Sequence, residues 1–476
     1  MTQAQTDKEV DYEQDLHELP AGWSWIALGE ICDAINGRAF KSTEWRESGV
    51  PIIRIQNLKD STASFNYFQG DLDAKHKVNA GDLLFAWSGT PGTSFGAHIW
   101  NGPNAALNQH IFNVQFDRKQ LDTKYLCYAL NQNVSRYVAQ AQGGVGLAHI
   151  TKSKFMASKV PIAPLDQQKR IVAEIEKQFS RLDEAVANLK RVKANLKRYK
   201  AAVLKAAVEG RLVETEAELA RREGRGFETG EQLLQRILET RRSQWFIPGR
   251  GQGKGKYKEP AAPETTALPE LPEGWVWASV DQLIGDSLIG LDRGRDQQNS
   301  EGIGTPYVKM NNVTMVGEVT SEGMVYVDAS RDEKERFNLQ ADDLLFNTRN
   351  SKELVGKVGI VRGLPNGAIY NNNLMRLRAV DGAVPNFLCS QMCSDGFRRR
   401  MDLVKKATTN VAAVYAKDLF PLPLALPPIA EQHSIVAEVD RRLSLLRETE
   451  AQVDANLRRA TRLRSAVLHK SFSNGI

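Results

Sequence analysis

The sequence predicts an α+β protein made by duplication, in which two pseudo-repeated globular domains alternate with two long helices that form an antiparallel coiled coil. Three observations predict this class. The chain has 476 residues, which is too long for one typical domain. A motif with two tryptophans recurs after about half the chain, and two long stretches carry apolar residues at helical spacing.

The duplication is visible as a series of matching segments. LPAGWSW at Leu19–Trp25 returns as LPEGWVW at Leu271–Trp277, an offset of 252 residues. The other matching pairs are Gly49–Asn57 with Gly304–Asn312, Asp82–Phe85 with Asp343–Phe346, and Pro164–Gln168 with Pro428–Gln432. We therefore expect a polar tail at 1–18, a first globule at 19–160, a first helix at 161–213, a linker at 214–267, a second globule at 268–425 and a second helix at 426–476.

Both globules contain short β-branched and aromatic runs separated by Gly, Asn and Pro, which is typical of α+β domains. Strands are expected at Pro51–Ile55, Asp82–Phe85, Ile111–Phe116 and Lys357–Val361, with no commitment to their order. Prolines at 161, 164, 421, 423, 427 and 428 are expected to end each globule before its helix begins.

The two long helices carry apolar residues three or four apart, the spacing of a coiled-coil seam. The second seam is less regular around Glu450 and Asn456, where polar residues could fix the register or meet another chain. The predicted seam residues are Ile171, Ile175, Phe179, Leu182, Val186, Leu189, Val192, Leu196, Tyr199 and Val203, and Ile435, Val439, Leu443, Leu446, Val453, Leu457, Leu463 and Val467.

The linker combines a short helix, expected over Glu231–Gln244, with a Gly- and Lys-rich run at Ile247–Pro260 that cannot build a core. We expect that run to be a basic, mobile connection.

Composition excludes several classes of protein. Four scattered cysteines do not make a disulfide framework, and no apolar run is long enough to cross a membrane. A cytoplasmic protein is expected. The 63 Lys and Arg exceed the 57 Asp and Glu by six, which fits a nucleic-acid partner as well as many others.

No catalytic or metal-binding motif is present: there is no phosphate-binding Walker loop, no zinc-protease motif, no serine-hydrolase elbow and no amino-methyltransferase motif, and the seven histidines do not cluster. Gly143–Gly146 is interpreted as a loop because its second-copy equivalent, Ala407–Asn410, has no glycine. Asp82 and Asp343 are interpreted as turn residues rather than catalytic acids.

Polar loops follow the DLLF runs of both copies, at Ala86–Gly96 and Asn347–Lys357. The flanking sequence pattern repeats, but the polar residues of the two loops differ. Arg, Lys, Asn and Gln can form hydrogen bonds to base edges, so this difference is what two domains that recognise different DNA sequences would require. Surface drift after duplication is the alternative.

Further polar clusters and basic runs fit the same hypothesis. Each polar cluster also fits turn chemistry, and the basic runs Lys190–Lys200, Arg398–Arg400 and Lys405–Lys406 fit either phosphate contacts or a solvated face. The polar candidates are Arg54, Gln56, Asn57, Asn108 and Gln109 in the first globule, and Arg293, Arg295, Lys309, Asn311, Asn312, Asn371 and Asn372 in the second.

With two LPxGW starts, two PxxxQ helix entries and this domain order, residues 19–476 resemble the specificity subunit of type I restriction-modification enzymes. The resemblance implies that each globule is a target recognition domain reading one half of a split double-stranded DNA sequence, and that the coiled coil sets the gap. It also implies two methyltransferase subunits, which carry S-adenosylmethionine and modify adenine N6, and two restriction subunits, which use ATP and Mg²⁺, in a bacterial or archaeal cytoplasm. This chain would then bind no cofactor itself.

The family's signature, an apolar DIL run followed by polar residues and glycine, falls on Asp82–Gly96 and Asp343–Gly359. The hypothesis is that Thr348, Arg349, Asn350 and Lys352 help to read the second half-site, and Ser88, Thr90, Thr93 and Gln109 the first. The first copy has Ser88 or Gly89 where Arg349 stands. A coiled-coil DNA-binding scaffold acting without a methyltransferase, or an enzyme of a new type, are the alternatives.

Overall fold

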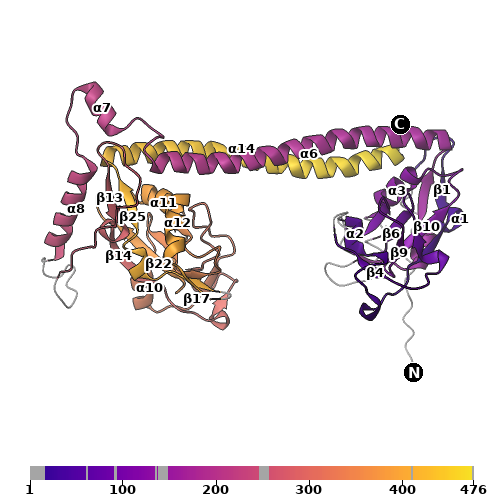
Figure 1. Ribbon diagram of the computed structural model, residues 1–476, viewed down its shortest axis with the longest axis horizontal. Coiled ribbons are helices and arrows are strands. Elements are labelled where there is room, and N and C mark those ends of the chain that lie inside the picture. Colours follow the sequence, from indigo (N-terminus) through magenta and orange to yellow (C-terminus); the bar gives the residue numbers. More distant parts are fainter. Residues whose placement is uncertain are drawn as a thin grey trace. The chain divides into compact units, whose positions relative to one another are not determined.

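The computed structural model describes residues 17–59, 63–89, 94–134, 137, 148–245, 257–408 and 411–473 (Figure 1). The chain divides into two compact units, Met1–Arg191 with Val453–Ile476, and Val192–Gln452. Each unit holds one β-rich globule and part of both long helices. The predicted α+β class, with two globules and two long helices packed together, is confirmed.

The first globule is built on two four-stranded sheets, ordered β2-β10-β6-β8 and β4-β3-β9-β5, and two strand pairs, β1-β12 and β7-β11. The β3–β9 pair is parallel and the others are antiparallel. The strands are β1 Ser24–Ala27, β2 Cys32–Asn36, β3 Val50–Ile53, β4 Asn66–Phe68, β5 Lys77–Val78, β6 Leu83–Ala86, β7 Ser88–Gly89, β8 Gly96–Ile99, β9 Ala105–Leu107, β10 Ile111–Phe116, β11 Ala148–His149 and β12 Lys159–Ile162. The helices are α1 Leu28–Ile31, α2 Ile55–Lys59, α3 Thr123–Gln132 and α5 Lys152–Ala157, with 3-10 turns η2 Ser42–Glu44 and η3 Ala74–His76.

The second globule repeats this plan, with sheets β14-β22-β18-β20 and β15-β17-β16-β21, the pair β13-β25 and the three-stranded β19-β24-β23. Its strands are β13 Val276–Ser279, β14 Ile284–Ile289, β15 Gln298–Asn299, β16 Thr305–Val308, β17 Val325–Val327, β18 Leu344–Asn347, β19 Arg349–Asn350, β20 Val358–Ile360, β21 Ile369–Tyr370, β22 Leu374–Ala379, β23 Lys406–Ala407, β24 Ala412–Ala413 and β25 Pro423–Leu426. Its helices are α9 Val280–Leu283, α10 Arg331–Phe337, α11 Pro385–Cys393, α12 Asp395–Val404 and α13 Ala416–Leu419, with the turn η4 Arg295–Gln297.

The DLLF runs form the central strands β6 and β18, and all their apolar side chains are buried. Phe85 packs against Phe95 and Phe155, with ring centroids 5.7 and 4.4 Å apart. Burial of this kind stabilises a fold by about 25 cal/mol for each Å² of apolar surface removed from water. These cores hold the loops at the strand ends in place.

The long helices are α6, Leu165–Val208, and α14, Ile429–Ser473, and they pack antiparallel. In the first unit the start of α6, at Ile171 and Ile175, packs with Phe472 near the end of α14. In the second unit the end of α6, at Val203, packs with Ile435 near the start of α14. The seam is not continuous, because the predicted seam residues Val192, Tyr199 and Leu463 are 41%, 48% and 43% exposed.

The repeated tryptophan and glutamine motifs join each globule to its helix. Trp23 Nε1 donates to Gln167 Oε1 at 2.8 Å, and Trp275 Nε1 donates to Glu431 Oε1 at 3.0 Å. Gln168 accepts from the Asp122 N–H and donates to the Ala163 carbonyl. In the second copy, Gln432 accepts from the Val384 N–H and donates to the Pro427 carbonyl. Buried amides with both functions satisfied fix the direction in which each helix leaves its globule.

The expected linker is more structured than a simple spacer. It contains α7, Glu216–Glu223, and α8, Gly230–Trp245, so the predicted short helix is confirmed. Leu233 and Ile237 of α8 are buried in the core of the second globule, which the sequence did not predict. Most of the Gly- and Lys-rich run, residues 247–256, lies outside the described residues.

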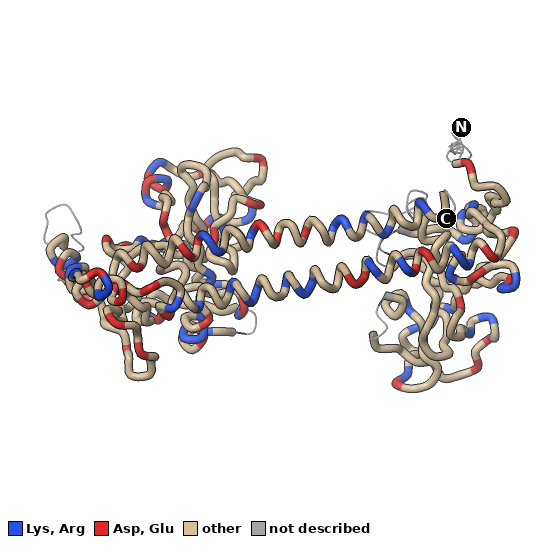
Figure 2. The backbone as a smooth tube through the Cα atoms, turned by 90° about the horizontal axis from the view of Figure 1, so that it is seen from above, with Lys and Arg blue, Asp and Glu red and all other residues tan. Residues whose placement is uncertain are grey.

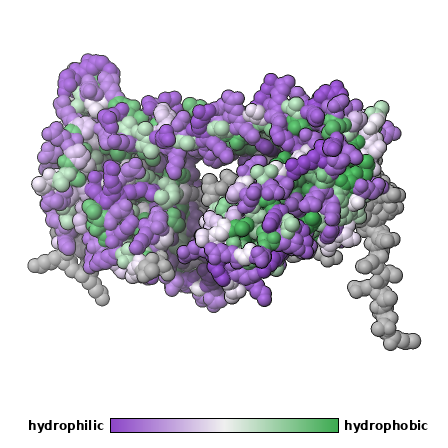
Figure 3. All heavy atoms as spheres, turned by 45° about the vertical axis from the view of Figure 1, so that its right-hand side comes forward, coloured by the Kyte–Doolittle hydropathy of each residue, from purple (hydrophilic) through white to green (hydrophobic). Residues whose placement is uncertain are grey.

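Prolines precede both long helices, as expected, but Pro161 and Pro423 lie inside the strands β12 and β25. Each of these strands pairs on one side only, where a missing N–H is tolerated. Among the described residues, no helix is long and apolar enough to span a bilayer, and Figure 3 shows hydrophobic residues only in separate groups on the visible face.

Candidate nucleic-acid interface

The loop between β9 and β10, Asn108–His110, is the centre of the candidate surface in the first globule. The Asn108 N–H donates to the Ile53 carbonyl at the end of β3, 3.2 Å away, and the Arg38 N–H donates to Leu107. The Trp87 N–H donates to the His110 carbonyl. The ends of β2, β3 and β6 therefore meet this loop at one edge, which we call the first loop edge.

The second globule builds the same edge around Asn371–Asn373. Asn371 N–H donates to Val308, Leu291 N–H to Tyr370, and Thr348 N–H to Asn373, at 2.9, 2.8 and 2.9 Å. We call this the second loop edge. The structure thus brings together candidates that lie far apart in the sequence, following β3 and β16, β6 and β18, and β9 and β21.

Glycine is required where the chain passes this loop. A Cβ at Gly37 would lie 2.1 Å from the Asn108 carbonyl oxygen, and one at Gly290 would lie 2.3 Å from the Tyr370 carbonyl oxygen. Real Cβ atoms do not approach backbone oxygens so closely, so both edges need glycine here.

The strand register identifies equivalent positions in the two edges. Ser88 pairs with His149 across β7 and β11, and Arg349 pairs with Ala413 across β19 and β24. Ser88, rather than Gly89, therefore occupies the position of Arg349. The predicted difference between the copies falls at one fixed backbone position.

The first loop edge is aromatic. The Trp87 ring contacts His110 and His149, with centroids 5.2 and 4.6 Å apart. Burial, and then the charge of His149, lower the pKa of His110 below its usual range. Gln109 is exposed and its Nε2 lies 3.2 Å from His110 Nε2, while Ser88 is buried. Thr90 and Thr93 lie outside the described residues.

Trp87 and His149 were not among the predicted site residues, and His110 was noted only as part of its loop. The signal that could have found them is the internal alignment, because their second-copy equivalents are Thr348, Asn373 and Ala413. The first copy has a tryptophan and two histidines where the second copy has small and polar residues. This difference indicates a surface whose chemistry is not the same in the two copies.

The second loop edge is cationic and polar. Arg349 is exposed, and no hydrogen bond or ion pair engages its guanidinium within the described part of the chain. Asn350 is half-buried, Lys352 is exposed, and Thr348 Oγ1 donates to the Asn373 carbonyl at 3.0 Å. An unpaired arginine on a short strand can make two parallel bonds to guanine O6 and N7.

Three predicted residues have their side chains engaged inside the fold. Asn57 and Asn312 are 4% and 0% exposed, and their Oδ1 atoms accept from the N–H groups of Arg54 and Lys309. The buried Asn371 donates to the Tyr307 hydroxyl. For these residues the structure favours the turn chemistry that the sequence left open.

The remaining candidates differ in how far they are engaged. Arg293 makes a two-bond ion pair with Glu333 at 2.8 and 2.9 Å, which favours a structural role. Arg54 donates to Asn66 and lies over the Trp45 ring, and Lys309 donates to Gln298. The residues Gln56, Gln109, Arg295 and Asn311 are exposed, and Asn108 and Asn372 are half-buried.

Asp82 and Asp343 have the structural role that was expected of them. The Asp82 carboxylate accepts from the Asn79 N–H, and that of Asp343 from the Gln340 N–H, at 2.9 and 2.8 Å. Arg118 and Arg378 neutralise them. No group of three or more His, Cys, Asp or Glu is placed to hold a metal ion among the residues that the structure describes.

Comparison with known proteins gives consistent matches. Residues 20–198 match the model of the type I restriction modification DNA specificity domain. The chain is 23% identical over 475 residues to the type I restriction enzyme EcoKI specificity subunit of Escherichia coli strain K12, covering 96% of this chain and 89% of that protein. It is 25% identical over 490 residues to the EcoBI specificity subunit of Escherichia coli, covering 98% and 89%.

A solved structure shares the fold. It is a chain from a study of the complex assembly and conformational transition of a type I restriction-modification system. The match covers 97% of this chain and 100% of that one, with a TM-score of 0.62 and 19% identity.

Proposed function

Because the chain belongs to the DNA specificity subunits of type I restriction-modification systems, we propose that its two loop edges each read one half of a split DNA target. A specificity subunit is non-catalytic, so the work of this chain is recognition. The main support for the proposal is that the two loop edges share one backbone arrangement but carry different side chains. The first edge has Trp87, Ser88 and His110 where the second has Thr348, Arg349 and Asn373.

The paired helices α6 and α14 support a fixed gap between the two half-sites. They are continuous over 44 and 45 residues, and each contributes to both compact units. Hydrogen-bonded helices that pack together near both of their ends resist bending more than a loop of the same length would. We propose that their length determines the number of unread base pairs.

The expected domain bounds stay part of the proposal, with one extension: α8 belongs with the second recognition domain because Leu233 and Ile237 lie in its core.

The relatives are components of restriction enzymes, and the solved chain comes from an assembly of such a system. We propose that this chain works in the same kind of complex, with two methyltransferase subunits that carry S-adenosylmethionine and two restriction subunits that use ATP and Mg²⁺. Its place would be the cytoplasm of a bacterium or archaeon.

Binding to split duplexes tests the proposal. The complex with its methyltransferase subunits should bind a duplex with both half-sites at one gap length, and lose at least tenfold in affinity when the gap changes by one base pair or when either half-site is scrambled, since each mismatched pair costs about 1–3 kcal/mol. Equal binding at all gap lengths would rule out a rigid bipartite reader and would leave a DNA-binding scaffold.

A further inference from the structure

A large basic cavity lies in the second unit, away from the second loop edge. Its volume is about 890 Å³, and α6 and α12 supply much of its wall. Trp277, Phe397 and Leu204 provide apolar surface, while seven of the lining residues are Lys or Arg and three are Asp or Glu. Two basic runs that lie about 200 residues apart in the sequence, Lys190–Lys200 and Arg398–Arg400, therefore contribute to one cavity.

Several of these cations already have partners. Arg211 pairs with Glu209, Arg398 donates to the Met315 carbonyl at 3.1 Å, and Arg400 lies over the Trp277 ring with its carbon Cζ 5.8 Å from the centroid. Burial lowers the pKa of Arg400. These contacts shape the cavity and leave other cations for a ligand.

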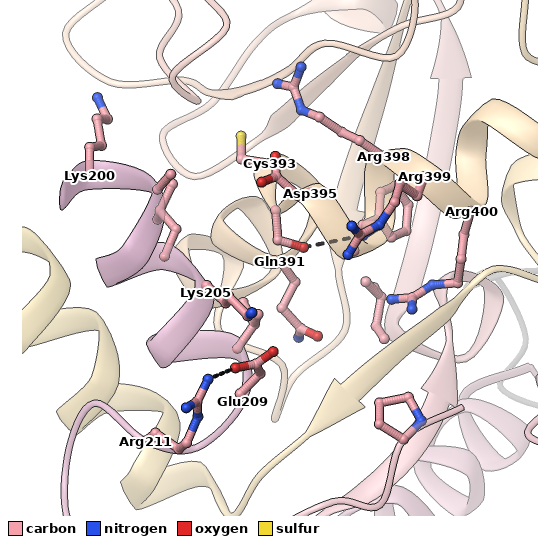
Figure 4. Close-up of a pocket in the computed structure, with 18 of the residues that line it drawn as sticks. Lys200, Lys205, Glu209, Arg211, Gln391, Cys393, Asp395, Arg398, Arg399 and Arg400 are labelled. Atoms are coloured by element: carbon pink, nitrogen blue, oxygen red, sulfur yellow. Dashed lines mark hydrogen bonds and ion pairs between the residues drawn. The ribbon is translucent and has the colours of Figure 1, made fainter. Parts of the chain in front are cut away.

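Four lining cations remain, Lys197, Lys200, Lys205 and Arg399. Of these, Lys205 of α6 and Arg399 of α12 are the pair considered for a ligand. Both are exposed, and neither side chain has a hydrogen bond or an ion pair among the described residues. Figure 4 shows Lys205 reaching toward the cavity from α6 and Arg399 from α12. Two unpaired cations on opposite walls repel each other, so an anion between them would stabilise both.

The cavity connects to the second loop edge through α12. Arg399 lies in the first half of this helix, and just after its end Lys405 Nζ donates to the Lys352 carbonyl at 3.0 Å. Lys406 pairs across β23 and β24 with Ala413, which also pairs with Arg349. From Arg399 to Lys405 the chain advances six residues, about 9 Å along a helix, which is the length of about three base pairs of DNA. Basic residues thus follow α12 from the candidate base-reading strand to the cavity.

We propose that this cavity binds a phosphate of the DNA backbone, held between Lys205 and Arg399, a few base pairs from the bases read at the second loop edge. The inference rests on the proposed function, since it takes the DNA bound there as its ligand. Phosphate suits the site because a lysine and an arginine on two walls neutralise an anion, and contacts to the DNA backbone position the duplex without reading its bases. Figure 2 shows that Lys and Arg also recur along both long helices.

The test measures how DNA affinity depends on salt, using the full chain with its methyltransferase subunits. Arg399→Gln and Lys205→Gln should each reduce the slope of log affinity against log salt concentration by about 0.9, and should weaken binding about fivefold to tenfold near 0.1 M salt. The loss should be equal for specific and scrambled duplexes. Arg399→Lys should restore both values because only charge is required.

Arg198→Gln is the matched control, because Arg198 is an exposed cation on the same helix that does not line the cavity. An unchanged slope in the cavity variants, or an equal change in Arg198→Gln, would overturn the inference. So would loss of methyltransferase-subunit binding with DNA affinity per complex unchanged, which would make the cavity a site for an acidic segment of that subunit. Failure of the proposed function looks different: the wild-type complex would show no preference for a split sequence.

Discussion

Single residues at fixed backbone positions carry the difference between the two halves of this molecule. Ser88 and Arg349 occupy one position of the strand register, and Gln109 and Asn372 occupy equivalent positions in the loops that follow β9 and β21. The sequence could predict that the loops after β6 and β18 differ. It could not show that Trp87, His110 and His149 meet, because that contact depends on pairing between distant strands.

Arg349→Ala should change recognition in the second half-site alone. Removing a two-bond contact to a base costs about 1–3 kcal/mol of discrimination, so methylation should spread to other bases at one position. Sequencing of methylated sites measures this. Arg331→Ala, on the exposed face of α10, is the control. A changed preference in the first half-site would contradict the modular assignment.

The two copies differ at the start of the long helix, where the second copy has Glu431 and the first copy has Gln167. Glu431 Oε1 accepts from Trp275, as Gln167 accepts from Trp23, and Glu431 Oε2 accepts from the Glu216 N–H at 3.0 Å. The carboxylate thereby ties α7 to the second globule–helix junction. Burial, reinforced by Glu216 and Glu218, raises the pKa of Glu431.

Glu431→Gln should therefore have a pH-dependent effect on the free energy of unfolding. A raised pKa in the folded state means that the wild type loses stability as pH rises through that pKa, whereas the variant does not. The variant lacks an acceptor for Glu216, which costs about 1–3 kcal/mol. Its deficit in urea unfolding should shrink as the pH rises above about 4.3, the ordinary pKa of a glutamate, toward the raised pKa of Glu431.

Glu273→Gln removes an exposed carboxylate near the same junction and should show no such trend. A deficit of Glu431→Gln that stays constant or grows with pH would show that Glu431 is not held against ionisation.

At the scale of elements, local periodicity predicted the helices well. The spacing of apolar residues located α6 and α14, and the expected helix at Glu231–Gln244 is α8. Packing was harder to predict. Nothing in the pattern of α8 shows that Leu233 and Ile237 join the second core, and the exposure of Val192 and Tyr199 depends on how two helices twist around each other.

Lengthening the helix pair should change the gap and leave the half-sites unchanged. Insertion of one heptad into α6 beside Arg191 and another into α14 beside Val453 keeps the seam in register. Seven residues add about 10.5 Å, or about three base pairs. Binding to duplexes with graded gaps measures the shift.

The control for this insertion places the same seven residues after Gly224, which has open space around it between α7 and α8. An unchanged gap in the double insertion, or an altered half-site, would contradict the role of the helices as a spacer.

For the whole molecule, the duplication is the feature that could be predicted most fully, by comparing the two halves of the sequence with each other. The matching motifs proved to be the central strands β6 and β18 and the two globule–helix junctions, because buried positions tolerate little change. The DNA-facing candidates could be placed only loosely, since Asn57, Asn312 and Asn371 look like surface amides in the sequence and are buried in the fold.

In the proposed function, two recognition domains read two half-sites at a fixed distance. Its most direct test is to express the chain with its methyltransferase subunit in a host that lacks such a system, and to map N6-methyladenine across the genome by single-molecule sequencing. One split motif with a constant gap is expected, and it should be absent when this chain is omitted. Methylation of a single uninterrupted motif, or of two half-sites at variable distances, would contradict it.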